Sequence, residues 1–285
     1  MSTQLDSLRR YVADRPEANP SPALGRVLLV GSGKGGVGTS TVAALVAVMA
    51  AADGQEVLLV DADESHGALP LMLGVQPERG IAGLRAGTLA PADLLVTLGH
   101  GLALLPLGGT ADVGDRTSPA DRRALLRRVS VLYERFDLVV VDAGSRLEQV
   151  RGAAAAGASR LLAVTAAERI AAAATYALIK TMDARFPGLP VDLLLNRCRM
   201  SVASNGFDEM VAATRHFLGR GIDFAGAVPD DDRLRTVLAE GTPLQDAAAL
   251  GTPATTACHE LAVTLARRID DSSPAVVGPR PSLRR

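Results

Sequence analysis

Short runs of Leu, Val and Ala recur along the chain, and each is followed by a longer stretch with helical spacing of apolar residues. The runs show no polar alternation, which is typical of strands buried on both faces of a parallel sheet. They lie at residues 26–30, 56–60, 102–106, 138–141, 160–164, 191–195 and 226–228. Strands that alternate with helices in this way predict an α/β fold, with a doubly wound, mostly parallel sheet covered by helices on both faces.

The two ends of the chain differ from this pattern. Residues 1–15 place Leu5, Leu8 and Val12 at helical spacing, and residues 16–25 contain three prolines. We therefore expect a short amphipathic helix over 1–15, a linker over 16–25 and one domain over 26–270. The Pro-rich, basic residues 271–285 are expected to form a flexible tail.

The composition narrows the classes of protein. The 285 residues carry a net charge of -1, and a general nucleic-acid binder would be basic overall. The two cysteines, Cys198 and Cys258, are too few for a disulfide framework or a zinc knuckle. The first 15 residues lack an apolar signal core, and the longest uncharged apolar run, 42–52, is shorter than a membrane span. A cytoplasmic protein is predicted.

A glycine-rich loop follows the first strand and precedes a helix. It reads Gly31-Ser-Gly-Lys-Gly-Gly-Val-Gly-Thr-Ser-Thr41. Against the phosphate-loop pattern G-x-x-x-x-G-K-[ST], Gly33 and Gly38 occupy the glycine positions and Ser40 the magnesium-binding hydroxyl, but Thr39 stands at the lysine. Glycines let backbone N–H groups point inward, and the following helix N-terminus adds positive potential. The predicted phosphate cradle comprises Gly33, Lys34, Gly35, Gly36, Val37, Gly38, Thr39, Ser40 and Thr41.

Polar residues stand at the carboxyl ends of three predicted strands. Asp61, Asp142 and Asn196 each follow an apolar run, and ligands of parallel sheets bind beyond those ends. Carboxylate and hydroxyl oxygens suit Mg²⁺. The alternative is that the two acids cap helices and that Asn196 belongs to a turn.

The segment K-G-G-x-x-G, which begins at Lys34, is one of five segments that together resemble a known protein family. Four more segments accompany it: residues 58–63 (LLVDAD), 138–142 (LVVVD), 195–197 (LNR) and 226–230 (GAVPD). Together they resemble the MinD/ParA superfamily of deviant P-loop ATPases. The resemblance implies ATP and Mg²⁺ as cofactors and a homodimer that forms around ATP.

The resemblance also implies residue roles. Lys34 would neutralise phosphate charge, mainly in the partner's site, and Asp63 would position the attacking water. Ser40, Asp61 and Asp142 would hold the magnesium ion or its water molecules. The adenine side would be formed by Asn196, Arg197 and Pro229. The alternative for Asp63 is a solvated loop acid.

Within that superfamily the chain most resembles the FlhG/FleN/YlxH regulators of flagellar number and placement. Residues 176–180 (YALIK) and the N-terminal segment 4–9 (QLDSLR) carry this likeness. It implies that the N-terminal helix stimulates a partner GTPase of the FlhF type. The alternative is a helix with no such role.

Departures from the family pattern gather around the γ-phosphate. Thr39 removes a lysine, Arg146 replaces a glycine after Asp142, and Ala174 replaces an expected Asp. We expect weak ATP binding and very slow or absent turnover. An arginine at 146 could supply charge, but a Cβ disturbs the backbone that a glycine provides. A pseudo-ATPase scaffold, or a positioning protein for a pilus, a chromosome or cell division, stays open.

Two predicted helices could contact other molecules or a membrane. The arginines of the predicted helix 120–133 are read as a solvated face, with an acidic partner or DNA as the alternative; no specific nucleic acid is predicted. In the last helix, 254–269, Leu261, Leu265 and Ile269 recur at four-residue spacing. Core packing is the expectation, and weak membrane contact, with placement at the membrane or a cell pole, is the alternative.

Overall fold

The structure is a computed structural model that describes residues 26–63, 67–108, 118–198 and 221–272, together with 208, 210, 212 and 214–216. The predicted N-terminal helix, the linker and the tail beyond residue 272 lie outside the described residues. The predictions for those segments are therefore not tested here.

The described residues form one eight-stranded sheet in the order β3-β4-β2-β5-β1-β6-β7-β8. All neighbouring strands are parallel except the β3–β4 pair at one edge. The strands are β1 (Val27–Ser32), β2 (Val57–Asp61), β3 (Val96–Gly99), β4 (Leu102–Pro106), β5 (Leu138–Asp142), β6 (Arg160–Ala166), β7 (Val191–Cys198) and β8 (Asp223–Pro229). The predicted fold class is confirmed.

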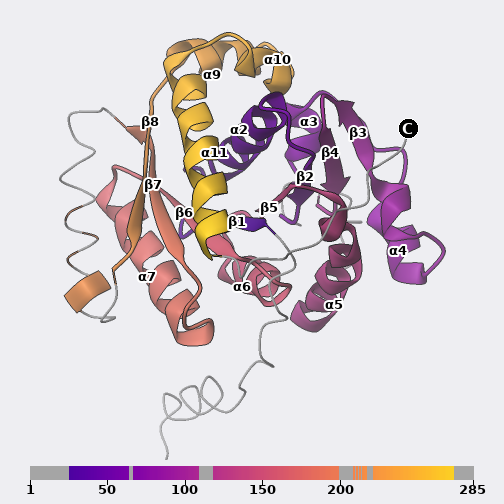
Figure 1. Ribbon diagram of the computed structural model, residues 1–285, viewed down its shortest axis with the longest axis horizontal. Coiled ribbons are helices and arrows are strands. Elements are labelled where there is room, and N and C mark those ends of the chain that lie inside the picture. The colour runs from indigo at the N-terminus through magenta and orange to yellow at the C-terminus, as the bar shows by residue number, and fades with distance from the viewer. Residues whose placement is uncertain are drawn as a thin grey trace, which may run out of the picture.

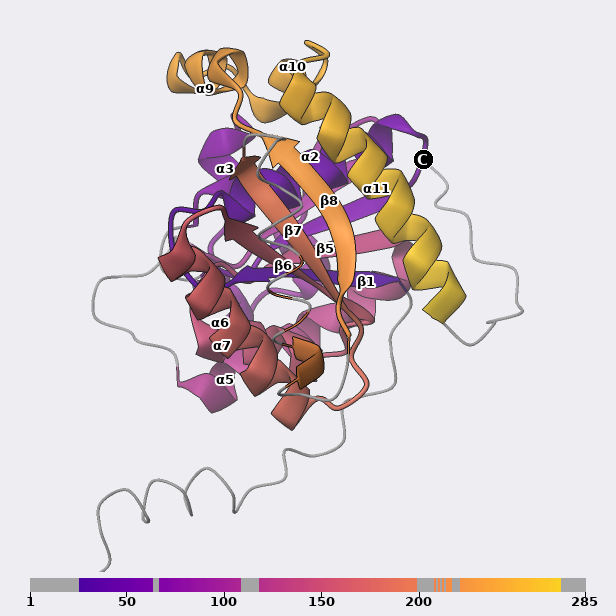
Figure 2. The same cartoon turned by 90° about the vertical axis from the view of Figure 1, so that its left-hand side faces the viewer.

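Helices cover both faces of this sheet (Figures 1 and 2). They are α2 (Thr39–Ala52), α3 (Leu69–Met72), α4 (Ile81–Ala86), α5 (Pro119–Val129), α6 (Leu147–Ala155), α7 (Arg169–Arg185), α9 (Asp232–Ala239), α10 (Leu244–Ala248) and α11 (Pro253–Ser272). Two 3₁₀ helices, η1 (Pro91–Leu94) and η2 (Ser130–Arg135), complete the set. Helices α2 and α11 pack in one apolar cluster, whereas α5, α6 and α7 pack in another on the opposite face.

Local differences from the predicted elements have simple causes. The predicted helix 120–133 divides into α5 and η2. The antiparallel edge strand β3 was not predicted, because only four residues with alternating exposure form it. Arg128 is not part of a purely solvated face, since its guanidinium donates to the carbonyl oxygens of Leu84 at 2.6 Å and Leu89 at 3.4 Å.

Helix α11 packs on the sheet beside α2. The stripe of Leu261, Leu265 and Ile269 is buried in the same cluster as α2, which confirms core packing. Arg268 also pairs with the buried Asp192 of β7 and donates to the Phe224 carbonyl oxygen at 3.1 Å. Membrane contact through this stripe would require α11 to leave the sheet. No helix in the described part of the chain is both long and apolar enough to cross a membrane.

Candidate nucleotide site

Residues 31–41, the P-loop, connect β1 to α2 and bend sharply at two glycines. Gly36 and Gly38 have φ values of 81° and 88°, a region that favours glycine. A Cβ at Gly38 would lie 2.3 Å from Asn196 Nδ2, and one at Gly33 would lie 2.1 Å from the Ala174 carbonyl oxygen. Gly33 is therefore required by the close approach of another backbone segment, and Gly38 by its positive φ and by the Asn196 side chain.

Thr39, which stands at the lysine position, is turned into the loop. Its side chain is buried, and its hydroxyl donates to Ser32 Oγ at 2.7 Å. Ser32 Oγ in turn donates to the Lys34 carbonyl oxygen at 3.0 Å. This pair of hydrogen bonds braces the loop from inside. Position 39 therefore contributes neither a charge nor a long side chain to bound phosphate.

Lys34 is held by its own chain. Its Nζ lies 2.9 Å from Glu168 Oε2, and the two side chains are 39% and 65% exposed. The hydrogen bond and the charge of Lys34 lower the pKa of Glu168. Glu168 precedes α7 as its N-cap residue. The sequence analysis missed this residue, although an acid between a strand and a helix at the ligand edge was a usable signal.

The acidic corner (Ser40, Asp61, Asp63 and Asp142) lies where β2 and β5 end. Asp61 and Asp142 are paired in register on these neighbouring strands and are almost completely buried. Burial, followed by the charge of Asp142, raises the pKa of Asp61 from 3.8 to about 7. Burial raises the pKa of Asp142 from 3.8 to about 6, against the hydrogen bond from the Ser40 side chain.

This corner fits a divalent cation. The Oδ2 atom of Asp61 is buried and has no hydrogen-bond partner among the described residues. A buried carboxylate without a compensating partner is costly, and a cation would relieve that cost. Mg²⁺ in nucleotide sites characteristically takes one or two carboxylates and completes its shell with water and phosphate oxygens. Ser40, Asp61 and Asp142 are the side chains that would hold it.

Asp63 is fixed beside this pair. Its N–H donates to Asp61 Oδ1 at 3.3 Å. A Cβ at Gly144, whose φ is 63°, would lie 2.5 Å from Asp63 Oδ2. The Gly144 N–H donates to Asp142 Oδ1 at 3.0 Å. Gly144 and Gly108, where a Cβ would lie 2.7 Å from Asp61 Oδ1, are site residues that the sequence analysis missed.

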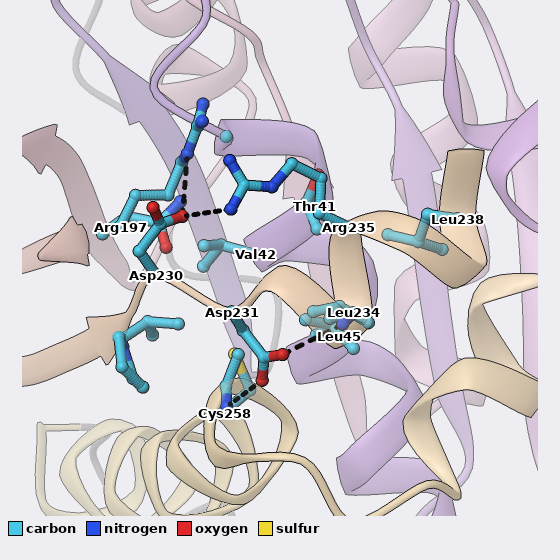
Figure 3. A pocket seen from close by; sticks show the side chains of 15 residues that line it. Thr41, Val42, Leu45, Arg197, Asp230, Asp231, Leu234, Arg235, Leu238 and Cys258 are labelled. Carbon is cyan, nitrogen blue, oxygen red and sulfur yellow. Dashed lines mark hydrogen bonds and ion pairs between the residues drawn. The ribbon is translucent and has the colours of Figure 1, made fainter.

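A cavity of about 200 Å³ opens beside the P-loop (Figure 3). Its wall includes Asn196, Arg197 and Pro229, so the predicted adenine-side residues do come together. Asn196 Nδ2 donates to the Val37 carbonyl oxygen at 2.7 Å, which ties β7 to the P-loop. Apolar side chains from α2, α9 and α11 add Val42, Leu45, Leu234, Leu238 and Cys258 to the lining.

Charged side chains lie at the rim of this cavity, which is called the base pocket below. Arg197 adopts a φ of 53°, and its Nε lies 3.7 Å from Asp230 Oδ1. Arg235 approaches the same oxygen at 3.5 Å from α9 (Figure 3). Asp231 accepts the N–H groups of Leu234 at 2.9 Å and Ala254 at 3.0 Å, which joins α9 to α11. The sequence analysis anticipated Arg197 here but neither Arg235 nor Asp231.

The two cysteines are both buried. Burial raises the pKa of the Cys258 thiol to about 12, and burial also raises the pKa of Cys198. Cys258 borders the base pocket, whereas Cys198 ends β7. Both thiols are therefore held protonated inside the fold, in positions unlike those of surface thiolate ligands.

Comparisons with known proteins agree with this geometry. A family model named ParA and described as an NUBPL iron-transfer P-loop NTPase matches residues 23–266. The chain therefore belongs to the ParA family of P-loop NTPases. This confirms the resemblance to the MinD/ParA superfamily that the sequence carried.

Individual relatives come from several branches. The antiactivator FleN of Pseudomonas aeruginosa is 26% identical over 211 residues, which cover 74% of this chain and 75% of FleN. The septum site-determining protein MinD of Bacillus subtilis is 29% identical over 227 residues, which cover 78% and 82%. The solved structure of Pyrococcus horikoshii MinD with Mg-ADP has a TM-score of 0.70 at 21% identity and covers 88% of this chain and all (100%) of that chain.

Proposed function

We propose that this protein is an ATP-binding regulator of flagellar number or placement that forms a homodimer around ATP and Mg²⁺. The proposal of ATP binding rests on one observation. The buried acidic corner, which has few cations near it, lies directly beside the P-loop and an apolar base pocket. FleN, an antiactivator by name, supports the regulatory part at the level of a relative. The protein acts in the cytoplasm, or peripherally at the membrane or a cell pole.

The base pocket favours an adenine ring. One N–H of Asn196 Nδ2 is donated to the Val37 carbonyl oxygen, which fixes the orientation of the amide, and we propose that Oδ1 faces the base. An acceptor oxygen suits the exocyclic amine of adenine and disfavours the keto oxygen of guanine. Replacing Asn196 by Asp keeps the acceptor but loses the donor to the P-loop. We expect this variant to bind ATP less tightly and still to prefer ATP over GTP.

Dimerisation is proposed to depend on Lys34. Lys34→Ala should leave the monomer folded, because the contacts of Gly33 and Gly38 shape the loop without it. ATP-dependent dimerisation should be abolished in this variant, as measured by light scattering with and without ATP-Mg²⁺. Lys180→Ala, which alters the only other lysine of the chain, is the matched control. A dimer that persists in Lys34→Ala removes the cross-subunit role.

The partner is proposed to be a GTPase of the FlhF type or another flagellar assembly protein, contacted through residues 1–15. Deletion of residues 1–15 should abolish stimulation of such a GTPase and leave ATP binding unchanged. Measured GTPase rates with the full chain and the shortened chain decide this. Equal stimulation by both chains contradicts the proposed role of the segment.

A second function is favoured by one observation, the inward-facing, uncharged Thr39. A pseudo-ATPase of the same fold would bind nucleotide weakly or not at all and act as a scaffold without turnover. The experiment that separates the two functions measures nucleotide affinity and ATPase rate side by side on the purified protein. Binding with hydrolysis above background supports a switch, and binding without hydrolysis supports a scaffold. The absence of binding overturns the ATP-dependent switch and leaves only the scaffold.

A further inference from the structure

The phosphate site of this chain is short of positive charge. Thr39 brings none, and Lys34 is paired with Glu168 at 2.9 Å. The acidic corner adds three carboxyl groups, of which Asp61 and Asp142 are almost fully buried. A nucleoside triphosphate adds several negative charges more, and Mg²⁺ offsets only two of them. A site of this composition needs a further cation if it is to hold a triphosphate.

One arginine stands at the right place to supply it. The loop after β5 is tied to the P-loop, since Ala143 N–H donates to the Val30 carbonyl oxygen and Ser32 N–H donates to the Gly144 carbonyl oxygen, both at 3.0 Å. A Cβ at Gly35 would lie 3.4 Å from Ser145 Oγ. Arg146 is the next residue and is the N-cap of α6.

The side chain of Arg146 is also uncommitted. It is exposed, and no hydrogen bond or ion pair of its guanidinium occurs among the described residues. Arg160 and Arg26, by contrast, are engaged: Arg160 lies 2.8 Å from Asp192, and Arg26 pairs with Asp270. An exposed guanidinium costs little to redirect, whereas the Lys34 ammonium must first leave Glu168.

We infer that Arg146 binds the terminal phosphate groups within its own subunit and so replaces the missing P-loop lysine. This inference rests on the proposed nucleotide binding and assigns it a residue. A guanidinium donates two parallel N–H groups to phosphate oxygens, a geometry that an ammonium lacks. Arg146 therefore contributes to affinity for phosphate. The inference assigns it no part in hydrolysis.

A double-mutant cycle tests the inference. ATP-Mg²⁺ is titrated into the unchanged chain, Arg146→Ala, Thr39→Lys and the double variant, at concentrations where light scattering shows monomers. Arg146→Ala should weaken ATP binding about tenfold to a hundredfold, the loss of one charge-assisted contact. Thr39→Lys should tighten binding in both backgrounds, and the gain should be larger when Arg146 is absent.

Four controls accompany the cycle. Arg127→Ala removes an exposed arginine of α5 and should bind ATP like the unchanged chain. Adenosine, which lacks phosphate, should bind equally to the unchanged chain and to Arg146→Ala. Thermal unfolding should show that all the variants are folded. Arg146→Lys should recover part of the lost ATP affinity.

The outcomes are distinct. If Arg146→Ala binds ATP as tightly as the unchanged chain, this inference is overturned and the proposed function stands. Equal losses of ATP and adenosine affinity, or strictly additive effects of Thr39→Lys and Arg146→Ala, also overturn it, because both assign the residue a role other than replacing the lysine. If the unchanged chain binds neither ATP nor adenosine, the proposed function fails together with the inference.

Discussion

The two sides of the P-loop differ in the charged side chains that they offer to a bound nucleotide. On the side of β2 and β5, Ser40, Asp61 and Asp142 form a corner that suits a divalent cation, and burial raises the pKa of both acids. On the opposite side, the position of the lysine holds Thr39, and Lys34 is occupied by Glu168. The difference teaches that metal coordination and phosphate neutralisation are separable functions, which one chain can keep and alter independently.

The largest expected effect lies on the metal side. Asp142→Asn removes a carboxylate that would hold Mg²⁺ and leaves a side chain of the same size. We expect the affinity for ATP in the presence of Mg²⁺ to fall by about a hundredfold, and the affinity measured in EDTA to change little. Titrations under both conditions measure the two affinities.

The matched control for this prediction is Glu134→Gln, which neutralises an exposed acid of η2. It should leave both affinities unchanged. An Asp142→Asn variant with undiminished Mg²⁺ dependence would mean that the metal does not bind on the side of β2 and β5.

The second prediction concerns pH. Because the folded-state pKa of Asp61 is about 7 and its ordinary value is 3.8, the folded protein binds more protons than the unfolded chain between these two values. The free energy of unfolding should therefore fall as the pH rises from about 4 to about 7, by on the order of a few kcal/mol. Mg²⁺ should reverse the loss above pH 7, where the acids are ionised, and should have little effect near pH 5.

Thermal unfolding in EDTA and in Mg²⁺ at pH 5 and pH 8 measures this dependence. Asp61→Asn should raise the melting temperature at pH 8 in EDTA and should flatten the pH dependence. Asp246→Asn, on α10, is the control and should keep it. A melting temperature that is independent of both pH and Mg²⁺ contradicts the assignment of a metal-free acidic corner.

Much of this site was predictable because it depends on local sequence order. The strand ends that carry Asp61 and Asp142, and the glycines at 33 and 38, follow from apolar runs and from a loop whose spacing is set by backbone geometry. The parallel sheet predicted that both acids lie at its ligand edge, and the structure adds the register that pairs them.

Other contacts could not be predicted, because they join distant segments. Glu168 reaches Lys34 across 134 positions of sequence, and Gly144 is required by its closeness to Asp63. Arg235 reaches the base pocket because α9 and α2, which are distant in sequence, both line it. The periodicity of a single chain does not indicate such contacts. The short strand β3 was not predicted for a related reason: pairing with its partner strand, rather than its own sequence pattern, makes it a strand.

A smaller effect is expected at the Lys34–Glu168 pair. Both side chains are substantially exposed, so the pair contributes little to stability, and Glu168→Gln should hardly change the melting temperature. It should, however, release the lysine that the proposed dimer needs. We expect the ATP concentration at half-maximal dimerisation to fall severalfold, as measured by light scattering. Glu148→Gln, which breaks an ion pair with Arg151 away from the P-loop, should have no such effect.

The smallest expected effect concerns hydrolysis. The resemblance implies that Asp63 would orient the attacking water, but orientation accelerates hydrolysis only when the charge that develops on the γ-phosphate is also stabilised. Thr39 supplies no charge for this, and the contact that we infer for Arg146 serves the binding of the phosphate groups, with no part in hydrolysis. Turnover should therefore lie near background, and Asp63→Ala should change it by less than about twofold, whereas ATP binding should persist. Phosphate release under single-turnover conditions measures this. A clear rate that collapses in Asp63→Ala would show that the altered side of the P-loop still completes a working catalytic site.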